Sequence, residues 1–252
     1  IYALDVSALR IERRGPVLRV NLARPERRNA FDAAMIAELH EAFADVGDAR
    51  AVVLAGDGES FCAGADVEWQ RASIDLTYEE NVIDARKLRQ MLETVNACPA
   101  PVVARAHGHA LGGGCGLLAC ADVAIAAEGT QFGFSEVKLG IVPAVISPMT
   151  IARIGPGAAR RYFVTGERFD AETALRIGLV HDVVADVDVA VEQVLREILS
   201  AGPEATRSAK RLATERPEGL ATDRWAAERR TSDEGQEGLR AFLEKRKPNW
   251  FD

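Results

Sequence analysis

The first two-thirds of the chain alternate short apolar runs with longer stretches in which apolar residues recur at helical spacing. Four short runs have the length and composition of β-strands, and two of them, 51–55 and 123–127, are continuously apolar, as is typical of buried strands. They span residues 17–22, 51–55, 102–106 and 123–127. Because helical patterns lie between these runs, the sequence predicts an α/β fold.

The helical patterns in this part are well delimited. Residues 34–46 place Ile36, Leu39 and Phe43 on one face, and Asp32 precedes them as a predicted N-cap. Residues 78–96 form a longer amphipathic pattern that prolines at 99 and 101 terminate, and a shorter helix is expected over residues 113–121.

Beyond about residue 187 the strand patterns stop. Helices are predicted over residues 187–200, 203–214, 221–231 and 234–245. We therefore expect two regions, an α/β core over residues 1–195 and a helical region over residues 196–252. Since no Gly/Ser-rich or Pro-rich linker separates them, the helical region is expected to pack on the core or on a neighbouring subunit.

Composition narrows the class of protein. The 252 residues are 48% hydrophobic and carry a net charge of −7, which disfavours a nucleic-acid partner. No apolar run reaches the roughly 20 residues of a membrane span, so no membrane association is expected. The four cysteines form no CxxC motif, and we expect them to be reduced in the core of a cytoplasmic protein: Cys62, Cys98, Cys115 and Cys120.

Several familiar cofactor motifs are missing. The glycines near residue 113 do not complete GxGxxG because position 117 is Leu, and neither GxxxxGK[ST] nor GxSxG occurs. His107 and His109 lie two residues apart, but no set of Asp, Glu or Cys completes a metal site around them. We therefore expect neither a metal nor an organic cofactor.

Two segments are poorly explained by packing, SFCAGAD over residues 60–66 and the glycine-rich stretch over residues 108–136. Gly112, Gly113 and Gly114 stand at the start of a predicted helix, where glycine costs stability. Helix N-termini offer unpaired N–H groups and a positive dipole end, which suit an oxyanion. A tight strand-to-helix turn is the alternative, and spacing alone does not separate the two.

Several separated stretches resemble the enoyl-CoA hydratase/isomerase, or crotonase, superfamily. They are NLARPERRNAFD (21–32), VVLAGDGESFCAGADVEW (52–69), residues 101–143 and FLEKRKPNW (242–250). The resemblance runs in order from about residue 10 to the end. It implies a spiral of ββα turns with a helical C-terminal trimerisation region, an acyl-CoA substrate, and assembly into a homotrimer or a hexamer formed by two trimers.

The resemblance also implies which residues form the site. The peptide N–H groups of Ala63 and Gly113 would hold the thioester oxygen, and CoA would lie along Ala63, Gly64, Ala65 and Asp66. CoA belongs to the substrate, so this chemistry adds no cofactor.

Lys245, within FLEKRK, matches a position that approaches the CoA phosphates. Arg246 and Lys247 beside it make a basic cluster suited to phosphate in an otherwise acidic protein. The alternative is a solvated basic end of a helix, favourable to the helix dipole.

Typical hydratases of this superfamily carry two glutamates that share a water molecule. In this chain the first position is Gly116, whereas the second, Glu136, is retained. Glu136 is therefore the expected catalytic proton carrier and must both take and give the proton, unless Asp84, Tyr78 or Ser135 assists. A single glutamate also resembles Δ3,Δ2-enoyl-CoA isomerases.

Other features resemble the bacterial methylglutaconyl-CoA hydratase branch, notably GIVPAVISPMTIARIG (140–155) and the GGGxG form of the turn. On this basis we expect reversible hydration of 3-methylglutaconyl-CoA or a related branched 2-enoyl-CoA. A Δ3,Δ2-isomerase and a general short-chain hydratase are the alternatives. Gly116 is expected to bind substrate by leaving space near C3 of the acyl chain, a space that Val145 and Ile146 reshape.

A distal carboxylate on the substrate needs a cation. Arg71, Arg86 and Lys87 lie in or near the predicted helix over residues 78–96. The more ordinary interpretation of each is a solvated charge on a helix face, so they are not counted as site residues.

Overall fold

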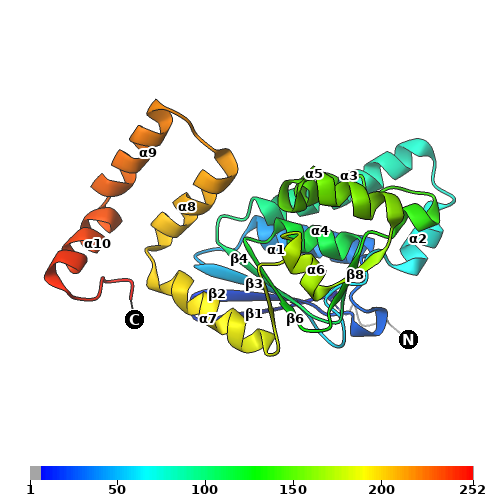
Figure 1. The fold of residues 1–252 in the computed structure, drawn as a ribbon, viewed down its shortest axis with the longest axis horizontal. Helices are drawn as coiled ribbons and strands as arrows, with labels where there is room; N and C mark the ends of the chain where they lie inside the picture. Colours follow the sequence, from blue (N-terminus) through cyan, green and yellow to red (C-terminus); the bar gives the residue numbers. More distant parts are fainter. Residues whose placement is uncertain (1–6, 252) are drawn as a thin grey trace.

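The computed structural model describes residues 7–251, and most of this part folds around two β-sheets (Figure 1). The larger sheet has the strand order β1-β2-β3-β4-β6-β9. All its neighbours are parallel except β1 and β2. Its strands are β1 (Leu9–Arg14), β2 (Val17–Leu22), β3 (Ala51–Gly56), β4 (Val102–Ala106), β6 (Val123–Ala127) and β9 (Asp182–Val184).

A second sheet of three short strands lies beside the first and has the order β5-β7-β8. β5 (His109–Leu111) runs parallel to β7 (Gln131–Gly133), and β8 (Arg168–Asp170) runs antiparallel to β7. The strand–helix alternation confirms the predicted α/β class.

Helices pack on both faces of the larger sheet. One face is covered by a large apolar core to which α1 (Ala33–Ala44), α3 (Tyr78–Asn96), α4 (Gly113–Cys120) and α5 (Ser147–Thr165) contribute. On the other face α7 (Val187–Ser200) buries Val187, Val191 and Leu195 against β2, β3, β4 and β6. Short elements complete the core: η1 (Pro25–Arg27), α2 (Val67–Ser73), η2 (Glu136–Leu139) and α6 (Ala171–Arg176).

Local capping explains why the predicted helices begin where they do. Asp32 caps α1 by accepting a hydrogen bond from the N–H of Met35 at 2.8 Å, as predicted. Thr77 and Glu80 form a capping box at the start of α3, a helix whose predicted bounds are confirmed.

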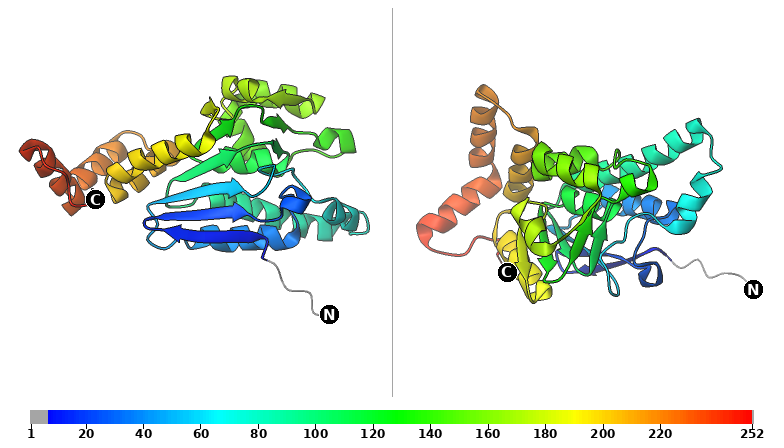
Figure 2. Two further views of the ribbon diagram at one scale, coloured as in Figure 1. Left: turned by 90° about the horizontal axis from the view of Figure 1, so that it is seen from below. Right: turned by 45° about the vertical axis from the view of Figure 1, so that its right-hand side comes forward.

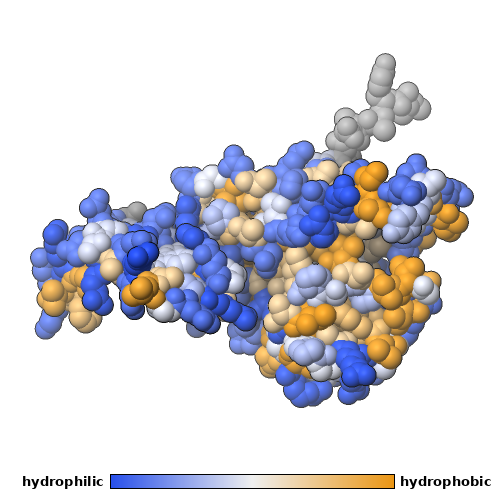
Figure 3. Space-filling model, turned by 90° about the horizontal axis from the view of Figure 1, so that it is seen from above, coloured by the Kyte–Doolittle hydropathy of each residue, from blue (hydrophilic) through white to orange (hydrophobic). Residues whose placement is uncertain are grey.

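The last three helices leave the core as an arm, clearly seen in Figure 2. The arm consists of α8 (Pro203–Glu215), α9 (Leu220–Thr231) and α10 (Asp233–Glu244). The boundary expected near residue 195 falls inside α7, which packs on the sheet, so the arm begins at α8. In Figure 3 the arm is largely hydrophilic with isolated apolar patches.

The four cysteines are buried and free, as predicted, and burial raises the pKa of the Cys62 and Cys120 thiols to about 12. Over residues 7–251, no helix is both long and apolar enough to cross a membrane.

Candidate active site

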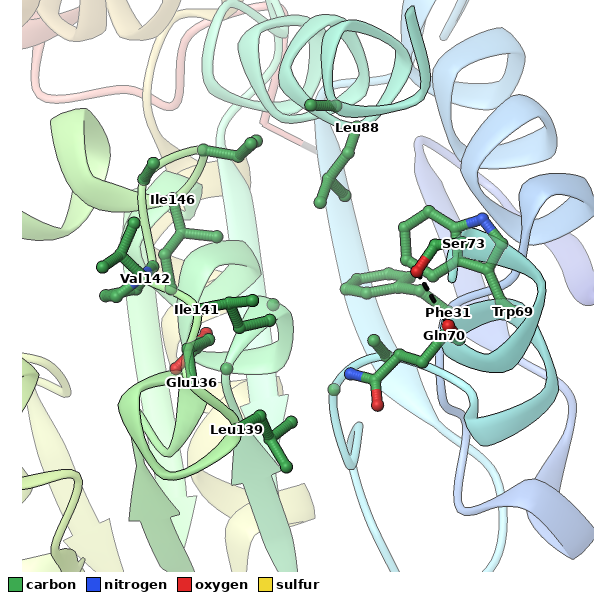
Figure 4. A pocket seen from close by; sticks show the side chains of 18 of the residues that line it. Phe31, Trp69, Gln70, Ser73, Leu88, Glu136, Leu139, Ile141, Val142 and Ile146 are labelled. Atoms are coloured by element: carbon green, nitrogen blue, oxygen red, sulfur yellow. Dashed lines mark hydrogen bonds between the residues drawn. The ribbon is translucent and has the colours of Figure 1, made fainter. Parts of the chain in front are cut away.

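A pocket of about 410 Å³ lies between α2 and α3 on one side and the η2–α5 segment on the other (Figure 4). Its size is typical of small-molecule sites. Glu136, Ile141 and Ile146 form one wall, and Trp69 and Leu88 belong to the facing wall. Residues 63–65 and 111–113, the two segments that packing explains poorly, both line it.

Backbone pairing brings these two segments together. Cys62 and Ala110 form a parallel bridge, with Cys62 N–H donating to His109 (3.0 Å) and Leu111 N–H donating to Cys62 (2.9 Å). Three residues beyond each partner of the bridge come Ala65 and Gly113. Because both segments run in the same direction from the bridge, both of these residues line the pocket.

Each glycine of the turn is required by a close approach. Gly112 has φ 49°, which favours glycine, and it precedes the first residue of α4. A Cβ on Gly113 would stand 2.4 Å from the Phe31 ring, and one on Gly114 would stand 2.5 Å from the carbonyl oxygen of Cys62. The turn is therefore tight, and it also presents the first N–H groups of α4 to the pocket. The two interpretations of the glycines are compatible.

The structure corrects the assignment of Ala63 as an oxyanion donor. Its N–H donates to the carbonyl oxygen of Arg28 at 2.9 Å and is therefore occupied. Ala65 lies two residues after Ala63, between two residues that both bond to Phe31. The N–H of Phe31 donates to the carbonyl oxygen of Gly64 (2.7 Å), and the N–H of Asp66 donates to the carbonyl oxygen of Phe31 (2.8 Å). The N–H of Ala65 between them therefore faces away from Phe31.

Neither Ala65 nor Gly113 has a backbone acceptor for its N–H among residues 7–251, and both residues line the pocket. Two unpaired N–H groups at one concave site are equipped to stabilise a developing oxyanion. The N–H of the expected donor Gly113 is thus available in the pocket, and so is that of Ala65, whereas the N–H of Ala63 is paired.

Glu136 is positioned by the second sheet. β7 pairs Gly133 with Leu111, and Gly112 donates to the carbonyl oxygen of Gly133 at 2.8 Å, which holds the end of β7 against the glycine turn. Glu136 follows Gly133 by three residues and is the first residue of η2, and its carboxylate points toward the glycine turn. Its Oε1 is 2.9 Å from the position that a Cβ on Gly112 would occupy.

The surroundings of Glu136 suit proton transfer. The residue is half-buried, and its Oε2 is buried with no hydrogen-bond partner within the described part of the chain. Burial raises the pKa of the Glu136 carboxyl, and a backbone hydrogen bond opposes part of this rise. A carboxyl with a raised pKa exchanges a proton more readily near neutral pH.

The structure also corrects the expectation for Gly116. This residue is buried and does not line the pocket, because the side chain of Ile146 covers it. A Cβ on Gly116 would stand 2.6 Å from Ile146 Cγ2. The space left by the missing glutamate is therefore filled by Ile146 and is not open to substrate.

Asp66 was expected to bind CoA, but its side chain stabilises the start of a helix and lies outside the described pocket lining. It is 4% exposed and caps α2 by accepting a hydrogen bond from Glu68 N–H at 2.8 Å. Arg24 contacts it at 3.2 Å and also pairs with Asp32 at 2.9 Å. Asp66 is absent from the described pocket lining, whereas Gly64 beside it is present. Its role is to fix the start of α2.

Lys245 does not approach the pocket within one chain. It ends α10 in a left-handed conformation (φ 53°) and is exposed on the arm. Arg246 is paired with Glu237 and Glu244. The described pocket lining extends no further along the chain than Ile146.

Of the additional candidates, Asp84 and Ser135 line the pocket, whereas its described lining does not include Tyr78, Arg71, Arg86 or Lys87. His107 and His109 contact Gly58 and Ser60. Over residues 7–251, no group of three or more His, Cys, Asp or Glu could hold a metal ion.

Sequence reasoning missed the contribution of α2, which places Trp69, Gln70 and Ser73 along the pocket. The N-cap at Asp66, followed by a helix-compatible stretch, was the available signal. Phe31, whose ring requires glycine at 113, was also missed, since the contact is far apart in sequence.

The fold and the site define an α/β protein in which two unpaired N–H groups and a buried carboxylate share one pocket. A model of the enoyl-CoA hydratase/isomerase family matches residues 12–252. The chain therefore belongs to this family, and the predicted enzyme of enoyl-CoA hydratase type is confirmed at that level.

Individual relatives agree with the family. The crotonyl-CoA hydratase of Syntrophomonas wolfei is 35% identical over 93% of this chain and 94% of its own length. YngF of Bacillus subtilis, a putative enoyl-CoA hydratase/isomerase, is 36% identical over 90% of this chain and 92% of its own length.

Solved structures support the same fold. Pseudomonas aeruginosa AtuE has a TM-score of 0.93 at 39% identity, covering 97% of this chain and 100% of that one. An enoyl-CoA hydratase from Shewanella pealeana has a TM-score of 0.91 at 38% identity, covering 98% and 97%. The expected crotonase-type fold is thus confirmed.

Proposed function

We propose that this chain catalyses the reversible hydration of a short 2-enoyl-CoA thioester. The observation that carries the proposal is the arrangement of the unpaired N–H groups of Ala65 and Gly113 in the same pocket as the Glu136 carboxylate. Such a pair of donors stabilises an enolate oxygen, and a carboxylate beside it can move protons at the adjacent carbons.

The reaction balances with water and the enoyl thioester alone. Glu136 removes a proton from water as the oxygen attacks C3, and the electrons of the C2–C3 double bond move toward the thioester oxygen. The N–H groups of Ala65 and Gly113 stabilise the resulting enolate. Protonated Glu136 then returns the proton to C2, which restores the carboxylate. The proposed reaction needs no metal or organic cofactor.

The charges of the pocket support an uncharged acyl chain. In the described lining, the ionisable side chains are Asp84 and Glu136, both acidic, and no Lys or Arg is present. An added carboxylate on the substrate would be repelled there. The relative from Syntrophomonas wolfei is named a crotonyl-CoA hydratase, and crotonyl-CoA carries an uncharged short chain. We therefore propose crotonyl-CoA as the reference substrate.

A second candidate substrate is 3-methylglutaconyl-CoA, which would give the protein a role in leucine degradation. The GGGxG turn and the resemblance to the bacterial methylglutaconyl-CoA hydratase branch favour it. Its distal carboxylate has no cation to pair with on the described pocket walls. Comparison of kcat/KM for crotonyl-CoA, 3-methylcrotonyl-CoA and 3-methylglutaconyl-CoA separates the effect of the methyl branch from that of the charge. A preference for the glutaconyl ester of tenfold or more over 3-methylcrotonyl-CoA would overturn the uncharged-chain proposal.

A reaction that uses Glu136 alone, without a glutamate at position 116, also fits a Δ3,Δ2-enoyl-CoA isomerase, in which Glu136 would carry a proton between two carbons. Incubation with crotonyl-CoA and with 3-hexenoyl-CoA, followed by enoyl absorbance, distinguishes the reactions. Hydration consumes the 2-enoyl chromophore, whereas isomerisation creates it. Isomerisation without hydration would contradict the proposed function.

Replacement of Glu136 by glutamine tests the proton carrier directly. Loss of a general acid–base typically costs about 10²–10⁴-fold in rate. We expect Glu136→Gln to lose hydration by about this factor while retaining butyryl-CoA binding. Ser73→Ala, a neutral change on the facing wall, serves as a comparison, because Ser73 bonds to Gln70 and not to Glu136.

Self-association through the arm is part of the proposal. α10 exposes Phe242 (80%) and Leu243 (77%), side chains that an isolated arm leaves in water. A homotrimer, alone or paired as a hexamer, would cover them and could bring Lys245 to the CoA phosphates of a neighbouring copy. Light scattering of the full chain and of Phe242→Asp checks this, since the variant should dissociate.

We place the reaction in the cytoplasm, which the buried free cysteines support.

A further inference from the structure

Gly116 and Ile146 form an interlocking pair beside the proposed active site. Ile146 is 3% exposed yet lines the pocket, because its inner side lies on Gly116 and its outer side faces the cavity. The site of a Cβ on Gly116 lies 2.6 Å from Ile146 Cγ2 and 3.8 Å from Leu92 Cδ1. No side chain larger than hydrogen fits at 116 while Ile146 keeps this position.

The pair lies one helical turn from the proposed chemistry. Gly116 N–H donates to the carbonyl oxygen of Gly112 at 3.1 Å, so both residues lie on one face at the start of α4, about 6 Å apart along its axis. Glu136 packs over Gly112, and Ile146 packs over Gly116. Along this wall the carboxylate therefore comes first and the apolar side chain follows (Figure 4).

The backbone holds Ile146 in place. It immediately precedes α5, whose first turn contains Pro148, and its carbonyl oxygen accepts from Thr150 N–H at 3.1 Å. Isoleucine is branched at Cβ and has few side-chain rotamers. The position of Ile146 in the wall is therefore restrained by its backbone and by its own side-chain shape.

We propose that Ile146, seated on Gly116, is the specificity-determining residue that limits the length of the acyl chain. This inference rests on the proposed function, because it places the thioester oxygen at Ala65 and Gly113 and the reacting carbons at Glu136. The chain beyond C3 then runs toward Ile146. The residue type at 116 acts through Ile146 and does not touch substrate.

The first experiment measures kcat/KM for crotonyl-CoA, 2-hexenoyl-CoA and 2-octenoyl-CoA with the wild-type protein and Ile146→Ala. Since a methylene in an apolar pocket changes specificity by tenfold or more, we expect Ile146→Ala to raise the octenoyl-to-crotonyl ratio by at least about tenfold. Ile151→Ala is the matched control, because Ile151 lies in the first turns of α5 close to Ile146 in sequence, is 38% exposed and is absent from the described lining. An unchanged ratio in Ile146→Ala would overturn the inference.

Binding separates this inference from the proposed reaction. Calorimetric titration with butyryl-CoA and octanoyl-CoA requires no turnover, and Ile146→Ala should shift relative affinity toward octanoyl-CoA by about tenfold. If binding shifts while no enoyl-CoA is hydrated, the length limit stands and the proposed function fails. If hydration occurs but neither ratio shifts, the function stands and the role of Ile146 fails.

A double-mutant cycle tests the contact between Gly116 and Ile146. Gly116→Ala alone should lower Tm, because its Cβ would stand 2.6 Å from Ile146 Cγ2. Ile146→Ala removes Cγ2 but keeps the Cβ of residue 146 at 3.0 Å, so the double variant should recover part of this loss. Additive effects of the two changes would show that the residues do not interlock.

Discussion

The carboxylate of Glu136 lies against the Cα of Gly112, with Oε1 2.9 Å from the position of an added Cβ. This contact joins the residue proposed to move the proton to the turn that presents the N–H of Gly113. The pairing of Leu111 with Gly133 holds the two together, so the second sheet sets the distance between proton carrier and oxyanion donor.

Gly112→Ala is expected to abolish most of the activity. The new methyl group would displace the Glu136 carboxylate, and the positive φ of Gly112 would add strain of about 1–3 kcal/mol. Gly129→Ala is the matched control, since Gly129 also has positive φ (79°) but no atom lies within 4 Å of its Cβ position. Both variants should lose similar stability by thermal unfolding, and a similar loss of kcat in both would contradict the assigned contact.

Glu136→Gln should stabilise the protein at neutral pH. The pKa of Glu136 is raised in the folded state, so its contribution to stability is full below the unfolded pKa and is lost as pH rises through the folded pKa. A neutral amide removes the cost of ionisation, and Tm at pH 7 should rise by a few degrees. The gain should disappear toward pH 4. A difference in Tm that does not depend on pH would argue against the buried, costly carboxylate.

The raised pKa of Glu136 also predicts the pH dependence of hydration. The carboxylate must be ionised to accept a proton from water, so kcat/KM should fall as pH decreases through the pKa of the free enzyme. The midpoint of this acid limb should lie above the ordinary glutamate value of 4.5. Asp84→Asn should leave the midpoint in place; a midpoint that moves with Asp84 would assign the limb to that residue instead.

Asp66→Ala should weaken the fold around α2. Burial alone would raise the pKa of Asp66, but the N–H of Glu68 and the nearby Arg24 outweigh burial and hold the pKa below its usual value. Loss of the N-cap and of one partner of Arg24 should reduce the free energy of unfolding by roughly 2–3 kcal/mol. Because the folded pKa is lowered, the stabilisation is present above the unfolded pKa and declines as pH falls. Denaturant unfolding at pH 7 and at pH 3 should show a smaller difference at the lower pH.

The predicted elements and the observed ones agree best where a strand or helix has a strong apolar pattern. β2, β4 and β6 have the predicted bounds because each lies inside the larger sheet and has apolar residues at most of its positions. The strands β5, β7 and β8 contain three residues each, too few for a recognisable period, and were missed. These short strands nevertheless hold Gly113 and Glu136 at the pocket.

Sequence patterns identified the two segments of the site but not the partners of individual atoms. Whether the N–H of Ala63 or of Ala65 is unpaired depends on Arg28 and Phe31, more than 30 residues earlier. Likewise, the loss of a side chain at Gly116 suggested open space, whereas Ile146, 30 residues later, fills it. Such long-range contacts leave no local signal in a single sequence.

Proline substitution at Ala63 and at Ala65 tests the corrected oxyanion donor. Proline removes the N–H of the substituted residue and places its ring carbon there. Ala65→Pro removes an N–H that has no backbone acceptor in the described chain, so the bonds of Phe31 to Gly64 and Asp66 can remain. We expect kcat to fall by about 10²–10³-fold, as for loss of one oxyanion donor, with a moderate change in Tm. Ala63→Pro instead breaks the 2.9 Å bond to Arg28 and should mainly lower Tm. If Ala63→Pro lost activity at unchanged Tm while Ala65→Pro remained active, Ala63 would be the donor after all.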